Sequence, residues 1–374
     1  MDRDATEDQR ALLDVSVRFM EETCPPAVVR DAERRNPEFT ATYRSQAAEL
    51  GWFSMLVPEA LGGASLSGNG VLDAALIAYL RGGRLQPGAF VGTNVVADAI
   101  ARAGSARLQA EVLPALVAGE ASAAWALSAT TAGSPAAGVD ARADGAGGLV
   151  LSGAKTAVLD IEPGGWLLVT ASSPDGPVQA VVAADAPGVG VVALESLDLS
   201  RRFAEVRLDA VAVAADAVLG DAASTAALVD HQLAVAATLV AAECVGAMAA
   251  EFAMTLQYAK DRIAFGRPIG SFQAIKHVLA DTSLAVEMSK AITLAAARTL
   301  GSEDGHGPSA ASMAKALVGD SAIDLAQNCF QVFGGIGYTW EHDQHLYLRR
   351  LTTDAGLFGD AAWHREHLCQ LSGI

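Results

Sequence analysis

Residues 262–273 read Arg262-Ile263-Ala264-Phe265-Gly266-Arg267-Pro268-Ile269-Gly270-Ser271-Phe272-Gln273, and they follow a long alanine-rich helical pattern. Gly266 and the run Pro268 to Gly270 break that pattern and predict a turn. Arg262 supplies a fixed positive charge on one side of the turn, and Gln273 supplies an amide on the other. This combination suits a phosphate-bearing cofactor. On these residues alone, an ordinary helix–turn–helix junction fits equally well.

Composition limits the classes of protein to which the chain can belong. Its 374 residues exceed one ordinary core and predict two or three domains. A net charge of −17 argues against nucleic acid as a partner. Four scattered cysteines without a Cys-x-x-Cys pair favour a reducing cytoplasm, and the acidic first residues do not resemble a secretory signal. Residues 233–254 are apolar enough to span a bilayer. However, Glu243 and Glu251 interrupt them, so we expect a buried helix and no membrane span.

Three regions differ in their hydrophobic pattern. Residues 1–121 show helical spacing punctuated by proline and glycine, and residues 122–220 show short β-branched runs separated by turns. Residues 221–374 return to the helical period, with long alanine-rich stretches at 232–260, 272–300 and 309–333. The predicted fold is multi-domain α+β: an N-terminal helical domain, a middle antiparallel β-domain and a C-terminal bundle of about four helices.

Six short motifs occur in order along almost the whole chain. They are Glu49-Leu50-Gly51-Trp52-Phe53 with Val57-Pro58-Glu59, Ala132-Gly133-Ser134, Leu151-Ser152-Gly153-x-Lys155, Asp198-Leu199-Ser200-Arg201-Arg202, Tyr258 to Gln273, and Gln331-Val332-Phe333-Gly334-Gly335-Ile336-Gly337-Tyr338. Together with the helix–strand–helix order, this set resembles the acyl-CoA dehydrogenase family. The resemblance implies FAD as the cofactor, an acyl-CoA or other acyl thioester as the substrate, and an oligomer in which subunits share the flavin.

The resemblance also implies site residues. Arg262, Phe265 and Gln273 would bind the flavin dinucleotide of their own subunit. Cofactor-binding positions across a subunit interface would be Gln331, Gly334 and Gly335. In the β-domain, Trp125, Leu127 and Ser128 would contact flavin, and Ser134 would contact the thioester. Physically, arginine gives pyrophosphate a charge-assisted bond, and paired glycines let backbone amides approach closely.

The β-domain departs from the family pattern at two places. Ala129-Thr130 replaces the usual Glu-Pro before Ala132-Gly133-Ser134, and Ala157 replaces a tryptophan that often covers the flavin. The packing against the flavin must therefore differ. Small residues at these positions, with Ala236 and Ala237, suggest the hypothesis of room for a bulky or branched acyl group.

The catalytic base is the largest departure. Removal of the α-proton beside a thioester needs a carboxylate in a dry site. The family segment that carries it falls at Leu357-Phe358-Gly359-Asp360, where no glutamate stands. The alternative family position on the preceding helix falls near Ala236. Glu243 lies seven residues further along the same helical face. Glu243 is either a relocated base or a carboxylate paired with an arginine or a backbone amide inside the bundle, and Asp360 is a second candidate base.

Histidine spacing raises one further possibility. His342-x-x-His345 and His364-x-x-His367 could bind a metal with Asp343 or Asp360 nearby. Histidines in a helical tail are more often surface or interface residues, so we predict no metal.

The resulting prediction is a cytoplasmic, oligomeric flavoprotein of fatty acid or lipid metabolism, with a tetramer as the expected assembly. It would introduce an α,β double bond into an acyl thioester and pass electrons to an acceptor similar to electron-transfer flavoprotein. One alternative is a catalytically deficient partner subunit of a heteromeric acyl-CoA dehydrogenase, and another is an acyl-thioester or flavin enzyme of the same fold that performs different redox chemistry. The missing base, the lost Glu-Pro and the missing tryptophan support the partner-subunit alternative.

Overall fold

The computed structural model describes residues 5–31, 36–127, 134–221, 223–302 and 305–374. Its N-terminal part is helical: α1 (Glu7–Thr23), α2 (Pro26–Arg30), α3 (Pro37–Glu49), α4 (Gly70–Gly83), α5 (Phe90–Ala103) and α6 (Leu113–Val117). Helix α1 begins at a capping box, because the Thr6 side chain accepts from the Gln9 N–H and the Gln9 side chain accepts from the Thr6 N–H. Helix α3 begins at Asn36, whose side chain accepts from the Phe39 N–H.

An eight-stranded sheet follows these helices. Its strands are β1 (Ala123–Ala126), β2 (Val139–Ala143), β3 (Leu149–Leu159), β4 (Trp166–Ser173), β5 (Gly176–Ala183), β6 (Val189–Leu194), β7 (Phe203–Val213) and β8 (Val218–Leu219). The spatial order is β6-β7-β3-β2-β4-β5-β8, and β1 pairs with β4. Most pairs are antiparallel, as the alternating pattern predicted, but β1 and β2 each pair with β4 in parallel. The apolar faces of the strands form their own core.

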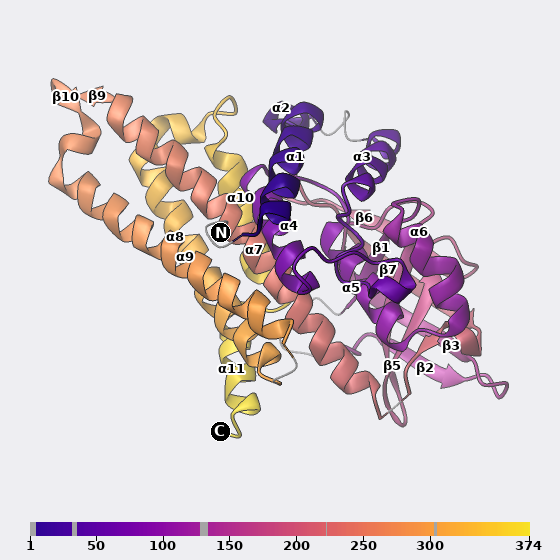
Figure 1. The fold of residues 1–374 in the computed structure, drawn as a ribbon. Coiled ribbons are helices and arrows are strands. Elements are labelled where there is room, and N and C mark those ends of the chain that lie inside the picture. The colour runs from indigo at the N-terminus through magenta and orange to yellow at the C-terminus, as the bar shows by residue number, and fades with distance from the viewer. Residues whose placement is uncertain (1–4, 32–35, 128–133, 222, 303–304) are drawn as a thin grey trace.

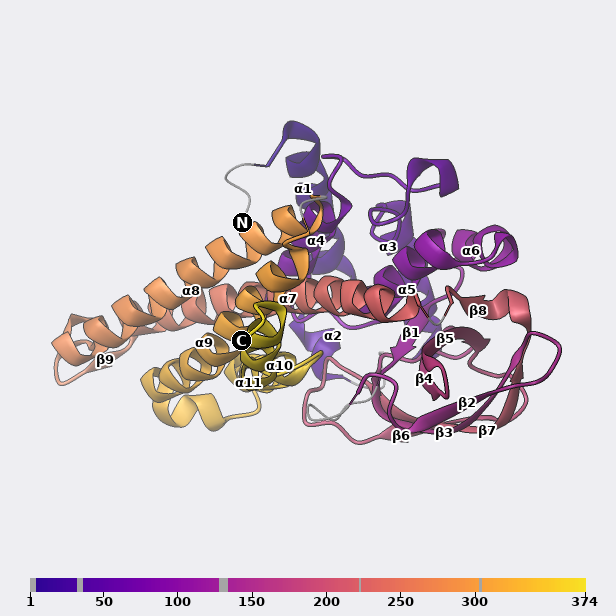
Figure 2. The same cartoon turned by 90° about the horizontal axis from the view of Figure 1, so that it is seen from below.

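The C-terminal part contains long helices: α7 (Thr225–Asp261), α8 (Gln273–Leu300), α9 (Gly307–Phe333), α10 (Gln344–Gly356) and α11 (Ala361–Leu371). Between α7 and α8 lies a small hairpin, β9 (Ile263–Ala264) with β10 (Arg267–Pro268). Figures 1 and 2 show this hairpin at the end of the molecule farthest from the large sheet. The predicted α+β fold class is confirmed. The exact domain boundaries at 121 and 220 remain predictions.

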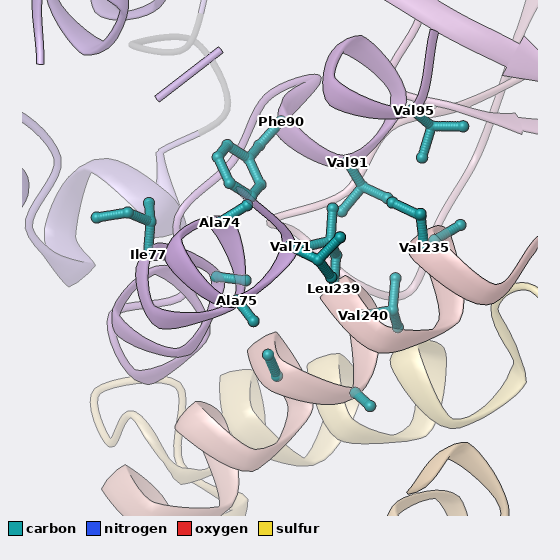
Figure 3. Close-up of a cluster of buried hydrophobic side chains, with 14 of the residues drawn as sticks. Val71, Ala74, Ala75, Ile77, Phe90, Val91, Val95, Val235, Leu239 and Val240 are labelled. Carbon is teal, nitrogen blue, oxygen red and sulfur yellow. The ribbon is translucent and has the colours of Figure 1, made fainter. Parts of the chain in front are cut away.

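Helix α7 forms the centre of the molecule. It packs against α4, α8, α9 and α10, and Figure 3 shows Val235, Leu239 and Val240 of α7 meeting apolar side chains of α4 and α5. By length and composition it is the candidate membrane span of the described residues, but 89% of its most apolar window is buried inside the protein. That burial is typical of a core helix.

Helices α4 and α7 approach each other unusually closely. A Cβ atom added to Gly82 would lie 1.7 Å from the Glu243 carbonyl oxygen, and one added to Gly246 would lie 1.9 Å from the Tyr79 carbonyl oxygen. Only glycine fits at both positions, because any side chain would push the helices apart. The crossing brings Arg81, beside Gly82, into reach of Glu243.

Candidate functional site

The predicted turn within residues 262–273 is a β-hairpin of β9 and β10. Phe265 and Gly266 form its two-residue loop with φ of +54° and +76°, the left-handed values of a type I′ turn. A phenylalanine in this conformation is an outlier. The Phe265 side chain is also 94% exposed. A strained, exposed aromatic residue is consistent with a surface that binds a ligand or a second chain.

The second predicted cofactor motif lies at the same end of the bundle. The ring of Phe333, the last residue of α9, lies 4.9 Å from the ring of Tyr258 in the last turn of α7. The chain then turns through Gly334, which has φ of +61°, and a Cβ added to Gly334 or Gly335 would meet no atom within 4 Å. The two glycines therefore present open backbone.

These residues fit the phosphate and adenosine end of a dinucleotide. Arg262, Gln273 and Gln331 are exposed, and in the described part of the chain their side chains have no hydrogen-bond partner. Arg262 is free to bind pyrophosphate in the bidentate manner of guanidinium groups. Tyr338, 79% exposed, follows the open glycines. The structure brings these predicted residues together at one end but leaves the site open to solvent, as a site completed by another subunit would be.

The β-domain residues meet a different environment. Trp125 on β1 is buried, and its indole N–H donates to Thr170 Oγ1 at 2.9 Å. Leu127 is half-buried, Ser134 is exposed, and Ser128 lies outside the described residues. Lys155 Nζ donates to the carbonyl oxygens of Pro135 and Ala137 just after Ser134.

The Trp125 ring is covered by the segment where the resemblance places the base. Phe358 stacks on Trp125 with ring centres 6.1 Å apart and planes 19° apart. An aromatic ring therefore fills the position expected of the carboxylate. Phe358 has φ of +54°, and Gly359 follows with φ of +100°.

Asp360 caps helix α11. Its Oδ1 accepts from the Trp363 N–H at 2.8 Å, the usual role of an aspartate at an N-cap. This contact accounts for Asp360 without catalysis. Its role as a base remains a prediction.

Glu243 is fully buried on α7 and paired with three arginines. Its Oε1 accepts from Arg81 Nε at 3.2 Å, and its Oε2 accepts from Arg201 Nη2 at 2.5 Å and from Arg350 Nη2 at 3.0 Å. Burial alone would raise the pKa of this carboxyl. The charges of the three guanidinium groups outweigh burial and hold its pKa well below the usual range.

A carboxylate held in this way is a poor proton acceptor, because both oxygens are occupied and its basicity is lowered. The contacts match the ion-paired alternative for Glu243. They count against a relocated base, and its catalytic role remains a prediction that the geometry does not favour.

The arginines around Glu243 belong to a larger group, the buried ion cluster, which pairs Arg81, Arg201 and Arg350 with Asp160, Glu243 and Asp354. Its members come from α4, the β-domain, α7 and α10. The Arg81 guanidinium also lies 4.7 Å from the Phe90 ring centre. Sequence reasoning missed every partner of Glu243. The sequence did show that Glu243 is an ionisable residue within an apolar helix. Such a residue rarely stays unpaired.

Three further expectations concern a metal site, the position of the histidines and the space for an acyl group. Among the described residues, no group of His, Cys, Asp and Glu could hold a metal ion. His345 and His364 are buried, so the expectation of surface or interface residues is wrong for these two. Ala236 and Ala237 are fully buried, and Ala236 belongs to the packed core, so neither leaves space for a bulky acyl group. Ala129 lies outside the described residues.

Known protein families and individual proteins match this chain over most of its length. Residues 6–120 match the family model of the acyl-CoA dehydrogenase N-terminal domain, and residues 226–370 match that of the C-terminal domain. The chain is 33% identical over 347 residues to acyl-CoA dehydrogenase FadE34 of Mycobacterium tuberculosis, covering 91% of this chain and 44% of that protein. It therefore spans less than half of FadE34. It is 29% identical over 355 residues to acyl-CoA dehydrogenase IpdE2 of the same organism, covering 94% and 93%.

Solved structures show the same fold. A Tcur3481-Tcur3483 steroid ACAD variant superimposes with a TM-score of 0.87 at 29% identity, covering 98% of each chain. The ChsE4-ChsE5 complex from Mycobacterium tuberculosis gives 0.85 at 26% identity, covering 100% of this chain and 99% of that one.

Proposed function

The chain belongs to the acyl-CoA dehydrogenase family, and from that membership we propose that it is the base-deficient subunit of a heteromeric, FAD-dependent acyl-CoA dehydrogenase. The assembled protein would introduce an α,β double bond into an acyl thioester. One observation carries the proposal: Phe358 stacks on Trp125, and Phe358 stands at the sequence position where the resemblance to the family implies the catalytic carboxylate.

Membership confirms four predictions: the family, the fold class, FAD as the cofactor, and an oxidoreductase that acts on acyl-CoA. In this family a carboxylate removes the α-proton, and FAD supplies the hydride acceptor when bound. The described residues of this chain offer the carboxylates Glu243 and Asp360 for the first task. Glu243 is ion-paired and Asp360 caps a helix.

Other residues of the chain suit a shared flavin site. Arg262 and Gln273 would bind the pyrophosphate side of FAD, and the backbone at Gly334 and Gly335 would accept its adenosine end. Their exposure supports completion of the site by a partner chain. Two of the similar solved structures are named after two proteins each, Tcur3481-Tcur3483 and ChsE4-ChsE5. FadE34 is more than twice as long as the matched segment. Both facts support a site assembled from two family domains.

The alternative is a dehydrogenase that works alone, with Glu243 or Asp360 as its base. For either assembly we propose an electron acceptor similar to electron-transfer flavoprotein, a tetramer and a cytoplasmic location. The buried ion cluster argues against the independent enzyme, because its ion pairs make Glu243 a poor proton acceptor.

Flavin content and substrate bleaching distinguish these functions. The chain would be purified alone and after co-expression with a family member that carries glutamate at the position of Phe358. Each sample would then be titrated with linear and ring-bearing acyl-CoA thioesters. We expect the co-expressed sample to be yellow and to bleach on addition of substrate. We expect no bleaching by the chain purified alone. Bleaching by the chain alone would overturn the proposal in favour of the independent enzyme, and a colourless co-expressed complex would overturn a shared flavin site.

A further inference from the structure

The loop between α10 and α11 holds Phe358 in an unfavourable backbone conformation. A left-handed φ of +54° is uncommon for a bulky residue and persists only where the surroundings hold it. Two buried side chains donate to carbonyl oxygens of this loop and of the last turn of α10. His364 Nε2 lies 3.0 Å from the Phe358 oxygen, and Lys315 Nζ lies 2.9 Å from the Gly359 oxygen and 2.8 Å from the Ala355 oxygen.

The contacts of His364 determine where its proton lies. A carbonyl oxygen can only accept, so Nε2 of His364 carries the hydrogen that bonds to Phe358. Burial and the nearby Lys315 ammonium lower the pKa of His364 to about 3, which keeps the ring neutral. Nδ1 is therefore an acceptor, and Ser312 Oγ, 3.1 Å away, donates to it.

The direction of these hydrogen bonds also determines the contact with a second histidine, His367. Because the single hydroxyl hydrogen of Ser312 points to His364, the Ser312 oxygen accepts from His367 Nδ1 at 3.2 Å. The result is a directed chain of hydrogen bonds from His367 through Ser312 and His364 to the carbonyl of Phe358.

Gly359 makes the contact between the loop and His364 possible. A Cβ added there would lie 2.7 Å from Trp363 Cε3 and 2.9 Å from His364 Nε2. Only glycine allows the imidazole to reach the neighbouring carbonyl, so the loop and the histidine form one unit.

We propose that His364, oriented by Ser312 and assisted by Lys315, is the positioning residue that holds Phe358 stacked on Trp125. This inference rests on the proposed function, in which Phe358 stands where the family has its base. In the proposed function, the stacked rings of Phe358 and Trp125 are a fixed part of this subunit.

Fluorine NMR of the fluorotryptophan-labelled full chain tests the stack directly. Trp125→Phe assigns the resonance of Trp125, and Phe358→Ala gives its position without the stacked ring. We expect His364→Leu to move the Trp125 resonance toward the Phe358→Ala position. His364→Gln should keep it near wild type, because the glutamine amide can still donate to the Phe358 carbonyl. An unmoved resonance in folded His364→Leu would overturn the proposal.

A measurement on the wild-type chain covers the case in which His364→Leu does not fold. Nitrogen NMR of labelled histidine reports which ring nitrogen carries hydrogen. We expect hydrogen on Nε2 of His364 and on Nδ1 of His367. If the ring hydrogen of His364 lies on Nδ1 and not on Nε2, the proposal is overturned. Neither measurement uses flavin, substrate or a partner chain. A chain that proves to be active alone would therefore refute the proposed function without altering this result.

Discussion

Arg201 and Glu243 lie 2.5 Å apart, Nη2 to Oε2, and join the β-domain to the centre of the helical bundle. Arg201 follows β6 in a connecting segment, whereas Glu243 is in the middle of α7. The same guanidinium group also contacts Asp354 of α10 at 2.8 Å. One arginine thus joins three parts of the fold: the β-domain, α7 and α10.

Replacement of Glu243 by glutamine should destabilise the protein. The variant keeps the shape of the side chain but leaves three buried guanidinium groups facing two carboxylates. Breaking a buried ion pair on one side costs roughly 3–5 kcal/mol. Urea unfolding would measure the free energy of unfolding.

Asp320→Asn is the matched control, because Asp320 pairs with Arg365 at the surface. Exposed pairs contribute about 1 kcal/mol or less. If Glu243→Gln lost bleaching in the assembled enzyme but unfolded like wild type, Glu243 would be a base and our assignment would be incorrect.

Alanine at Gly246 should prevent the close crossing of α4 and α7. The added Cβ would lie 1.9 Å from the Tyr79 carbonyl oxygen, a distance that only backbone movement can relieve. We expect a loss of roughly 3 kcal/mol or more, at the upper end of the usual effects of point mutations. Gly335→Ala is the control, since its Cβ would meet no atom within 4 Å. Equal melting temperatures for both variants would contradict the importance of the crossing.

Alanine at Arg262 should weaken flavin binding. A charge-assisted hydrogen bond is worth about 1.5–3 kcal/mol, which corresponds to roughly a tenfold to hundredfold loss of affinity. Arg267→Ala removes the same charge from strand β10 of the hairpin, where the guanidinium lies 4.0 Å from the Phe272 ring centre. Flavin titration of the assembled complex would compare them. A larger loss for Arg267→Ala would mean that Arg267, and not Arg262, contacts the cofactor.

The sequence was most informative where structure is local. The alanine-rich periods at 232–260, 272–300 and 309–333 predicted α7, α8 and α9 to within a few residues at most ends, because helical amphipathic spacing repeats along the segment. Strand β1 was missed because Ala123 to Ala126 lack β-branched residues. The hairpin at Phe265 was expected only as a turn, since a phenylalanine in a left-handed conformation has no sequence signature.

The candidate site was less predictable than the helices. Positions 81, 201 and 350 lie far apart in sequence, and only the folded chain brings their arginines to Glu243. Likewise, the stack of Phe358 on Trp125 depends on how α10, α11 and β1 meet. A missing glutamate can be seen in the sequence, whereas the ring that fills its place cannot.

Glu251 predicts a pH dependence of stability. It is buried on α7, its Oε1 accepts from Gln344 Nε2 at 2.9 Å, and in the described residues its Oε2 has no hydrogen-bond partner. Burial raises its pKa to about 8, although the bond from Gln344 opposes the rise. The folded protein therefore binds this proton more tightly than the unfolded chain, in which the pKa of the carboxyl is about 4.5.

The sign of the effect follows from that difference. The contribution of protonated Glu251 to stability is fully present below pH 4.5 and is lost as the pH rises through about 8. Across this window the slope is up to about 1.4 kcal/mol per pH unit. Glu251→Gln cannot ionise and should remove this slope, so the variant should gain stability relative to wild type as the pH rises. Urea unfolding from pH 5 to pH 8 would measure it, with exposed Glu38→Gln as the control. An unchanged slope in Glu251→Gln would mean that Glu251 is ionised inside the folded protein, with an undescribed partner for its second oxygen.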